Sequence, residues 1–345
     1  MFGGDLKTLV IQTAYLGDLV LTLPLIGAVK RILGSELHVL SIPSNRDIIT
    51  GHPSVDKIIV YDKKKSEKGW LSFIRLVLCL RKEKYDIVFV PHPSFRSALL
   101  AFLTGASQRV GFSNSAGRIF FSSVVKFDAD KHQCERYLDL LKNFSAGYTG
   151  TTDFQFFIKT DEESEKRAAE IIGKNKLYVG LNPGSVWATK RWLPEYYAEL
   201  GDAVYRELRC DVIIFGGPED INIAEDVSNM IKCPHINLAG KTGLKLLSAL
   251  IKRCAVFVTN DSGPMHIAAS FGVPTVAIFG PTIKEFGFSP YSKNSVVVEK
   301  CLYCRPCGNH GPAICPEGHF KCMRDILVQD VFAEVKKMIV PLENQ

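Results

Sequence analysis

Short apolar runs alternate with longer amphipathic stretches from the first residues of the chain onward. TLVIQ, LHVLSI, KIIVYD and DIVFVP are rich in β-branched residues and predict strands, while GDLVLTLPLIGAVKRIL and WLSFIRLVLCLRK have the apolar spacing of helices. The strand-like runs are apolar on both faces, which is typical of a parallel sheet covered by helices on each side. The first half of the chain is therefore predicted to be a doubly wound α/β domain.

A second series of the same kind begins near residue 177. It comprises LYVGL, a helix from about Pro194 to Leu208, DVIIF, a helix after Glu219, LKLLSALIKRC, AVFV, a helix after Gly263, and PTVAIF. Between the two series, KTDEESEKRAAEIIGKNK has too few apolar residues for a strand and predicts a surface helix plus a linker, with the domain boundary between residues 160 and 175. We expect two Rossmann-like domains, over residues 1–165 and 175–325, and a closing helix with its tail over 326–345.

Composition narrows the class of protein. The 345 residues are 46% hydrophobic and 23% charged, as in ordinary globular proteins, and the net charge of +6 is scattered along the chain. A mildly basic chain favours an anionic ligand or a membrane surface, but without a basic cluster it does not predict nucleic-acid binding. Neither a secretory leader nor a run of ~18 apolar residues is present, so a cytoplasmic protein is expected.

In open α/β sheets, ligands bind beyond the carboxyl ends of the strands, so polar residues that follow strands are candidate site residues. Gly17 and Asp18 come after the first predicted strand, where a helix begins. Asp18 has two interpretations. It either caps that helix or favours its positive end, or it accepts a proton from a substrate hydroxyl as a general base.

The segment NPGSVWATKRWLP follows the first strand of the second half. Lys190 offers a point charge and three donors to a diphosphate, and Gly184 and Ser185 let the backbone approach it closely. The alternative is a solvated turn with a surface lysine. The chain has no Walker or GxGxxG pattern, so ATP hydrolysis and dinucleotide binding have no support.

Glu219 follows the next strand, in FGGPED. Its carboxylate is suited to accept hydrogen bonds from ribose hydroxyls, or it stabilises the N-terminus of the following helix.

The segment TNDSGPMHIAAS carries the clearest pattern. Asp261 ends a strand, Ser262 and Gly263 form a turn, Pro264 suits the first turn of a helix, and His266 lies within that turn. Free backbone N–H groups at such a helix start bind phosphate. In the alternative interpretation, Asp261 is only an N-cap and His266 is a packed surface histidine.

Together these motifs resemble glycosyltransferase family 9, the ADP-heptose:lipopolysaccharide heptosyltransferases, and within it the heptosyltransferase II group. The matching segments are GDLVLTLP, NPGS with KRWLP, FGGPED, and TNDSGPMHIAA followed by GVPTVAIFGPT. Their order and spacing extend the resemblance over nearly the whole chain. It implies a GT-B fold, in which two Rossmann-like domains face a central cleft, the N-terminal one holding the acceptor and the C-terminal one the nucleotide sugar.

The resemblance also implies an inverting transfer of L-glycero-D-manno-heptose from ADP-heptose to the inner core of lipopolysaccharide. Asp18 matches the family's catalytic base. The donor-binding positions are matched by Ser185, Lys190, Glu219, Asp261, Ser262, Gly263, Met265 and His266. Because Lys190 and the backbone donors of the turn are suited to meet the charge of the departing ADP, no cofactor is expected to be required, and a contribution from Mg²⁺ stays open.

The partners that the resemblance implies are ADP-heptose, a lipid A–Kdo acceptor with or without its first heptose, and the cytoplasmic face of the inner membrane. The association with the membrane is expected to be peripheral.

Five of the ten cysteines lie in one segment, CLYCRPCGNHGPAICPEGHFKC, residues 301–322, together with His310 and His319. CxxCxxC followed by two more cysteines has metal-ligand spacing, and four thiolates suit zinc or an iron–sulfur cluster. The alternative is a cysteine-rich loop stiffened by prolines.

Two other classes of function stay open from the sequence. One is an enzyme of the same architecture with a different substrate, either another nucleotide-sugar transferase or a sugar-nucleotide epimerase. The other is a non-enzymatic metal-binding protein built around the cysteine segment.

Overall fold

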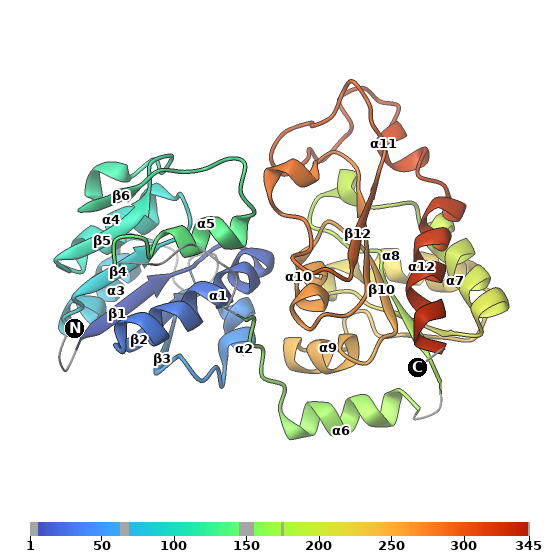
Figure 1. Ribbon diagram of the computed structural model, residues 1–345, viewed down its shortest axis with the longest axis horizontal. Coiled ribbons are helices and arrows are strands. Elements are labelled where there is room, and N and C mark those ends of the chain that lie inside the picture. Colours follow the sequence, from blue (N-terminus) through green and yellow to red (C-terminus); the bar gives the residue numbers. More distant parts are fainter. Residues whose placement is uncertain (1–5, 63–68, 145–154, 174–175, 344–345) are drawn as a thin grey trace. The chain divides into compact units, whose positions relative to one another are not determined.

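The chain forms two compact units, Met1–Lys159 and Thr160–Gln345. The computed structural model describes residues 6–62, 69–144, 155–173 and 176–343. Each unit contains a six-stranded parallel sheet with helices packed against it (Figure 1). The predicted α/β fold with two doubly wound halves is confirmed. The first domain was expected to end at residue 165, whereas the structure places residues 160–165 with the second unit.

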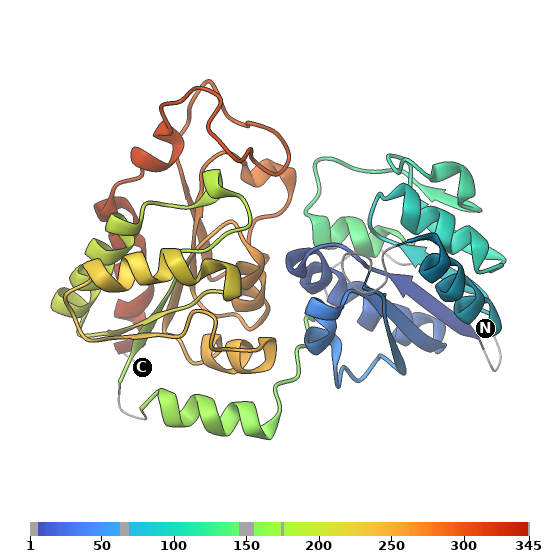
Figure 2. The same ribbon diagram turned by 180° about the vertical axis from the view of Figure 1, so that it is seen from behind.

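The sheet of the first unit has the strand order β3-β2-β1-β4-β5-β6, and every pairing is parallel. Its strands are β1 (Lys7–Ile11), β2 (Glu36–Ser41), β3 (Lys57–Val60), β4 (Ile87–Val90), β5 (Gln108–Phe112) and β6 (Ser123–Val125). Its helices are α1 (Leu16–Leu33), α2 (Arg46–Ile49), α3 (Trp70–Lys82), α4 (Phe95–Leu103) and α5 (Gln133–Asp139). The two opposite views show α1 and α5 against one face of this sheet and α3 and α4 against the other (Figures 1 and 2).

The second unit repeats the plan with the order β12-β11-β10-β7-β8-β9. Its strands are β7 (Tyr178–Asn182), β8 (Asp211–Ile214), β9 (His235–Asn237), β10 (Val256–Asn260), β11 (Thr275–Phe279) and β12 (Ser295–Glu299). Its helices are α6 (Glu162–Ile171), α7 (Pro194–Leu208), α8 (Ile221–Met230), α9 (Leu244–Ile251), α10 (Gly263–Ser270), α11 (Lys321–Arg324) and α12 (Val328–Glu343). The predicted helix from Pro194 to Leu208 matches α7 at both ends.

The central strands explain why the sequence predicted this architecture well. Every residue of β4, β7, β10 and β11 is buried, so these strands lack the polar alternation of a sheet with one solvated face. The edge strand β12 was not predicted, because its residues are only half-buried and it follows a polar stretch.

The strand order reverses between β1 and β4 in the first unit and between β7 and β10 in the second. In doubly wound sheets the crevice for a ligand opens at this switch point. Asp18 follows β1, the NPGS segment follows β7, and the TNDSG segment spans the end of β10. The fold therefore places three of the four sequence motifs next to a switch point.

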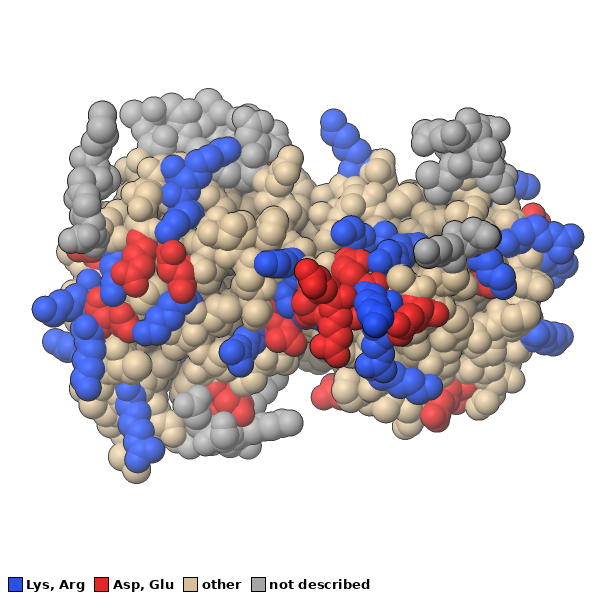
Figure 3. Space-filling model, turned by 90° about the horizontal axis from the view of Figure 1, so that it is seen from below, with Lys and Arg blue, Asp and Glu red and all other residues tan. Residues whose placement is uncertain are grey.

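Helix α6 lies in the charged segment that separates the two predicted series. Its N-cap Asp161 accepts a hydrogen bond from the backbone N–H of Ser164 at 2.7 Å. Acidic and basic side chains are interspersed over its outer face (Figure 3). Glu165 pairs with Arg253 at 2.7 Å, which ties α6 to the second unit. The predicted surface helix is confirmed, but it belongs to the second unit rather than to a free linker; residues 174–175 lie outside the described residues.

The predicted closing helix is α12. Its residues Val331, Val335 and Ile339 are fully buried in the core of the second unit, where they pack with strands and with α7. The final two residues of the predicted tail lie outside the described part of the chain.

Candidate active site

Asp18 lies in the first turn of α1. The helix begins at Leu16, and its N-cap is Tyr15, whose extended backbone precedes the helix without a side-chain capping bond. Asp18 is therefore not the cap, but as an acid in the first turn it is stabilised by the positive end of the helix. The hydroxyl of Tyr137 donates a hydrogen bond to Asp18 Oδ1 at 3.2 Å.

Tyr137 comes from α5 and is almost completely buried. Burial, reinforced by the negative charge of Asp18, raises the pKa of the Tyr137 phenol well above its usual value. The phenol therefore stays protonated and remains a donor toward the carboxylate. Tyr137 lies 119 residues from Asp18 in the sequence, so no local sequence pattern could predict this contact.

A buried glutamine connects the end of β1 to α1. Gln12 Nε2 donates to Thr22 Oγ1 at 2.8 Å, and Thr22 Oγ1 donates to the carbonyl oxygen of Asp18 at 2.7 Å. Gln12 and Thr22 are both fully buried. These bonds fix the first turns of α1 against the strand and so set the position of Asp18.

In the second unit, two strand-end asparagines hold the neighbouring loops together. Asn260 Nδ2 donates to the carbonyl of Pro183 at 2.8 Å, and its Oδ1 accepts from the backbone N–H of Trp192 at 3.0 Å and from Tyr197 at 3.1 Å. Because Asn260 is fully buried, each of these bonds is needed to satisfy its amide. It locks the NPGS segment to the end of β10.

Asn182, the last residue of β7, makes the corresponding contacts with the turn before α10. Its Nδ2 donates to Thr259 Oγ1 and to Ser262 Oγ, both at 3.1 Å. Both asparagines lie within the motifs NPGS and TNDSG, but the sequence alone does not predict a role for them. The available signal was an amide residue at the end of a predominantly apolar run.

Lys190 and Asp261 form the charged centre of this unit. Lys190 Nζ lies 2.5 Å from Asp261 Oδ2, and the two side chains are only 10% and 11% exposed. Thr282 Oγ1 donates to the same carboxylate oxygen at 2.8 Å, and Ser185 Oγ donates to the Asp261 backbone carbonyl at 3.4 Å. The interpretations of Lys190 as a surface lysine and of Asp261 as an N-cap are both wrong.

Ser262 is the N-cap of α10. Its backbone is extended, its side chain makes no capping bond to the helix, and its hydroxyl is directed toward Asn182 instead. Gly263 and Pro264 open the helix, so the first turn presents backbone donors together with the positive end of the helix dipole. This start lies beside the ion pair of Lys190 and Asp261, because Asp261 immediately precedes the cap.

Met265 and His266 are both buried in the first turn of α10. His266 is 5% exposed, so its interpretation as a surface histidine is wrong. Of the predicted donor-binding residues, the structure therefore brings together Ser185, Lys190, Asp261, Ser262, Gly263, Met265 and His266 around the ends of β7 and β10.

Glu219 lies apart from this cluster, in a short 3₁₀ turn after β8, and its side chain is exposed. The neighbouring Asp220 is the better-anchored carboxylate: its Oδ2 accepts from the backbone N–H of Gly217 at 3.0 Å, and its Oδ1 lies 4.0 Å from Arg191 Nη2. A Cβ at Gly184 would overlap the Asp220 carboxylate. The absence of a side chain at Gly184 is therefore explained by its packing against Asp220. From the sequence alone, it was explained by the close approach of a diphosphate.

The cysteine-rich segment is anchored by an arginine. Arg305 Nη2 pairs with Glu299 at 2.8 Å and donates to the carbonyl of Thr282 at 2.6 Å. Cys322 is buried in the core, and burial raises the pKa of its thiol to about 11. Throughout the described ranges, three or more His, Cys, Asp or Glu side chains are nowhere arranged to hold a metal ion.

Comparison with known proteins identifies the family. The model of "Glycosyltransferase family 9 (heptosyltransferase)" matches residues 73–314. Lipooligosaccharide heptosyltransferase 2 of Campylobacter jejuni is 30% identical over 97% of this chain and 100% of its own length. Lipopolysaccharide heptosyltransferase 2 of Escherichia coli is 26% identical over 98% of this chain and 100% of its own.

Solved structures agree with these sequence matches. A family 9 glycosyltransferase from Veillonella parvula superposes with a TM-score of 0.88 at 26% identity, and the match covers 99% of both chains. The ADP-heptose lipopolysaccharide heptosyltransferase II of Escherichia coli superposes with a TM-score of 0.81 at 24% identity, covering 98% of this chain and all of the other. By sequence and by fold, the chain belongs to glycosyltransferase family 9, the heptosyltransferases.

Proposed function

We propose that this glycosyltransferase moves heptose from ADP-heptose to the inner core of lipopolysaccharide, as the names of its full-length relatives indicate. The observation that carries the proposal is the buried pair of Lys190 and Asp261 at the start of α10. It combines a lysine with the backbone donors of a helix start, which is the chemistry that a nucleoside diphosphate needs.

The proposed reaction is a single displacement with inversion. The acceptor hydroxyl oxygen attacks the anomeric carbon of the donor while its proton passes to Asp18, and the bond between that carbon and the diphosphate oxygen breaks. Tyr137 donates a hydrogen bond to Asp18 Oδ1, which orients the carboxylate that takes the proton. The negative charge that develops on ADP is met by Lys190 and by the first turn of α10.

Asp261 has a different role from the one expected of a sugar ligand. Its carboxylate fixes the ammonium group of Lys190 with the help of Thr282. An ammonium group has three N–H donors, so Lys190 can keep its bond to Asp261 while it donates to the diphosphate. Glu219 remains our proposed ligand for the adenosine ribose, supported by its exposed place after β8.

We further propose that the protein works at the membrane surface as a peripheral protein. No helix in the described ranges is both long and apolar enough to cross a membrane. Helix α3 instead exposes large apolar side chains along its outer face, namely Trp70, Leu71, Ile74 and Leu78, which are 68%, 72%, 36% and 55% exposed.

The cations of α3 make a lipid surface the fitting occupant of this face. Arg75, Arg81 and Lys82 are exposed on the same helix. An apolar stripe flanked by cations is the arrangement with which interfacial helices bind anionic headgroups. A lipid-anchored acceptor is then presented to the protein at the surface where it docks.

The test of the transfer reaction uses purified protein, ADP-heptose and lipid A–Kdo acceptors that carry zero or one heptose. We expect a product one heptose heavier by mass spectrometry from one of the two acceptors, with release of ADP. Failure with both acceptors would exclude the proposed substrates, and conversion of ADP-heptose to an epimeric ADP-sugar without transfer would indicate a sugar-nucleotide epimerase.

A further inference from the structure

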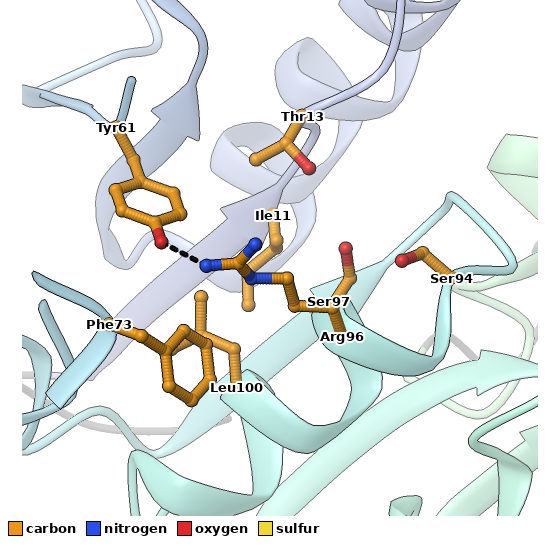
Figure 4. Close-up of a pocket in the computed structure, with 8 residues that line it drawn as sticks. All are labelled: Ile11, Thr13, Tyr61, Phe73, Ser94, Arg96, Ser97 and Leu100. Carbon is orange, nitrogen blue, oxygen red and sulfur yellow. Dashed lines mark hydrogen bonds between the residues drawn. The ribbon is translucent and has the colours of Figure 1, made fainter. Parts of the chain in front are cut away.

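A cavity outside the donor site lies at the switch point of the first unit. It opens beyond the carboxyl ends of β1 and β4, where doubly wound sheets bind ligands. Its wall combines two aromatic rings, three aliphatic hydroxyl groups and one cation (Figure 4). The polar and aromatic residues that line it are Thr13, Tyr61, Phe73, Ser94, Arg96 and Ser97.

The guanidinium group of Arg96 is held between the two rings. Its central carbon lies 5.3 Å from the ring centroid of Tyr61 and 5.1 Å from that of Phe73, and its Nη2 donates to the Tyr61 hydroxyl. Both rings are buried, at 2% and 4% exposed. The rings therefore fix the guanidinium before any ligand arrives, which reduces the entropy cost of binding.

Arg96 differs from other arginines of the chain in its charge partners. Elsewhere, Arg253 pairs with Glu165 and Arg305 with Glu299. Among the residues that the structure describes, no carboxylate forms an ion pair with Arg96. A guanidinium has five N–H donors in one plane, and a single one is used by Tyr61, so an edge remains for an anion.

Hydroxyl groups occupy the other side of the cavity. Thr13 and Ser97 are 7% and 4% exposed, and Ser94 is the N-cap of α4, whose side chain makes no capping bond. Figure 4 shows the hydroxyls of Ser94 and Ser97 directed toward the same space beside Arg96. The start of α4 adds the positive end of its dipole to this space.

We propose that this cavity binds an acidic group of the acceptor saccharide, a carboxylate or a phosphate, through Arg96. The inference rests on the proposed function and adds a site that selects the acceptor. A planar guanidinium matches the two oxygens of such a group, and the hydroxyls beside it can donate further hydrogen bonds to those oxygens. The donor diphosphate has its own cation in the other unit, Lys190.

The variant Arg96→Gln tests the proposal, with Arg118→Gln, an exposed arginine of the same unit outside the cavity lining, as the matched control. We expect Arg96→Gln to raise the KM for the acceptor about 10- to 100-fold, the effect of losing hydrogen bonds to a charged group, while the KM for ADP-heptose stays unchanged. Arg96→Lys keeps the charge but loses the planar fork, so it should recover only part of the affinity.

Two modified acceptors identify the group that is bound. One has its sugar-acid carboxylate reduced to an alcohol, and the other has its phosphates removed. Wild type and Arg96→Gln should have the same KM for the acceptor that lacks the recognised group and different KM values for the other. An unchanged acceptor KM in Arg96→Gln, or an equal penalty with both modified acceptors, would overturn the proposal.

Binding of an acidic group in the cavity can also be tested without the transfer reaction. If wild type transfers heptose to no acceptor, the proposed function fails, and the cavity is then tested by titrating the delipidated acceptor oligosaccharide into wild type and Arg96→Gln by calorimetry. Weaker binding to the variant supports the cavity as an acidic-group site, and equal binding excludes it. Thermal unfolding of each variant shows whether a loss reflects misfolding.

Discussion

Asp18 is held by its surroundings in the way a general base requires. Thr22, itself held by Gln12, donates to the backbone carbonyl of Asp18, and one carboxylate oxygen of Asp18 accepts from Tyr137. We expect Asp18→Asn to lower kcat at least ~100-fold, with the KM values nearly unchanged, because the amide fits the same space but cannot take the proton. Steady-state kinetics with saturating donor and acceptor measure this.

Asp47→Asn is the matched control, since Asp47 is also an acid in the first turn of a helix of the first unit. It should keep wild-type turnover. Near-normal turnover in Asp18→Asn would exclude the assignment of the base.

Lys190 and Asp261 should be coupled in stability. Lys190→Met leaves the Asp261 carboxylate without its counter-charge at a site that is 11% exposed, which should lower the free energy of unfolding by about 3 to 5 kcal/mol. The double variant Lys190→Met with Asp261→Asn should recover most of that loss, because no unpaired charge remains. Urea denaturation of the single and double variants measures the coupling.

The double variant of Lys190 and Asp261 should recover stability but not turnover. The double variant lacks the cation that meets the charge on ADP, so its kcat should stay about 100-fold below that of wild type. A stable double variant with full turnover would remove Lys190 from the mechanism.

His52 should make stability depend on pH. Burial lowers the pKa of its imidazole from 6.5 to about 4. Between these pH values the unfolded chain binds the proton and the folded chain does not, so the free energy of unfolding falls as the pH drops, by up to about 1.4 kcal/mol per pH unit. Urea denaturation at several pH values measures this dependence of the free energy of unfolding on pH. In His52→Gln the contribution of the imidazole should disappear, and an unchanged dependence would show that His52 is not its source.

At the scale of an element, α3 combines two roles. Its inner residues Phe73, Leu76 and Leu80 are buried in the core of the first unit, while its outer face is apolar and exposed. We expect Leu71→Gln with Leu78→Gln to reduce binding to vesicles that contain anionic lipid at least ~10-fold, because about 25 cal/mol is lost per Å² of apolar surface that no longer enters the lipid. Vesicle cosedimentation measures this.

Met230→Gln, at an exposed apolar position of α8 in the second unit, should bind vesicles like wild type. The double variant of α3 should also keep wild-type kcat on a delipidated acceptor. Equal vesicle binding by wild type and the α3 variant would show that another surface meets the membrane.

At the scale of the whole molecule, the proposed site supplies its own positive charge. In the proposed mechanism, Lys190 and the first turn of α10 meet the charge of the diphosphate, so we expect transfer to continue without a divalent metal. Turnover in excess EDTA should stay within about 2-fold of its value in Mg²⁺, since the electrostatic stabilisation comes from groups of the chain. A large loss in EDTA that Mg²⁺ restores would show that a metal carries part of that charge.

The two-unit plan was predictable from the sequence because it rests on local patterns. Runs such as those of β7 and β10 are buried at every position, and burial on both faces of a sheet favours apolar residues along most of each strand. The edge strand β12 escaped prediction because it is only half-buried. The first domain ends a few residues earlier than predicted, because α6 packs against the second unit. The ion pair between Glu165 and Arg253 that holds it there joins residues far apart in the chain.

The sequence by itself determined which residues follow the strands, and hence most of the candidate site: Asp18, Ser185, Lys190 and the turn before α10. Only the tertiary structure decided their partners. Tyr137 reaches Asp18 across 119 residues, and Asp261 reaches Lys190 across 71. Such contacts depend on the packing of separate elements rather than on the pattern of any one, which is also why Arg96, an ordinary helical residue in the sequence, is recognised only between the rings of Tyr61 and Phe73.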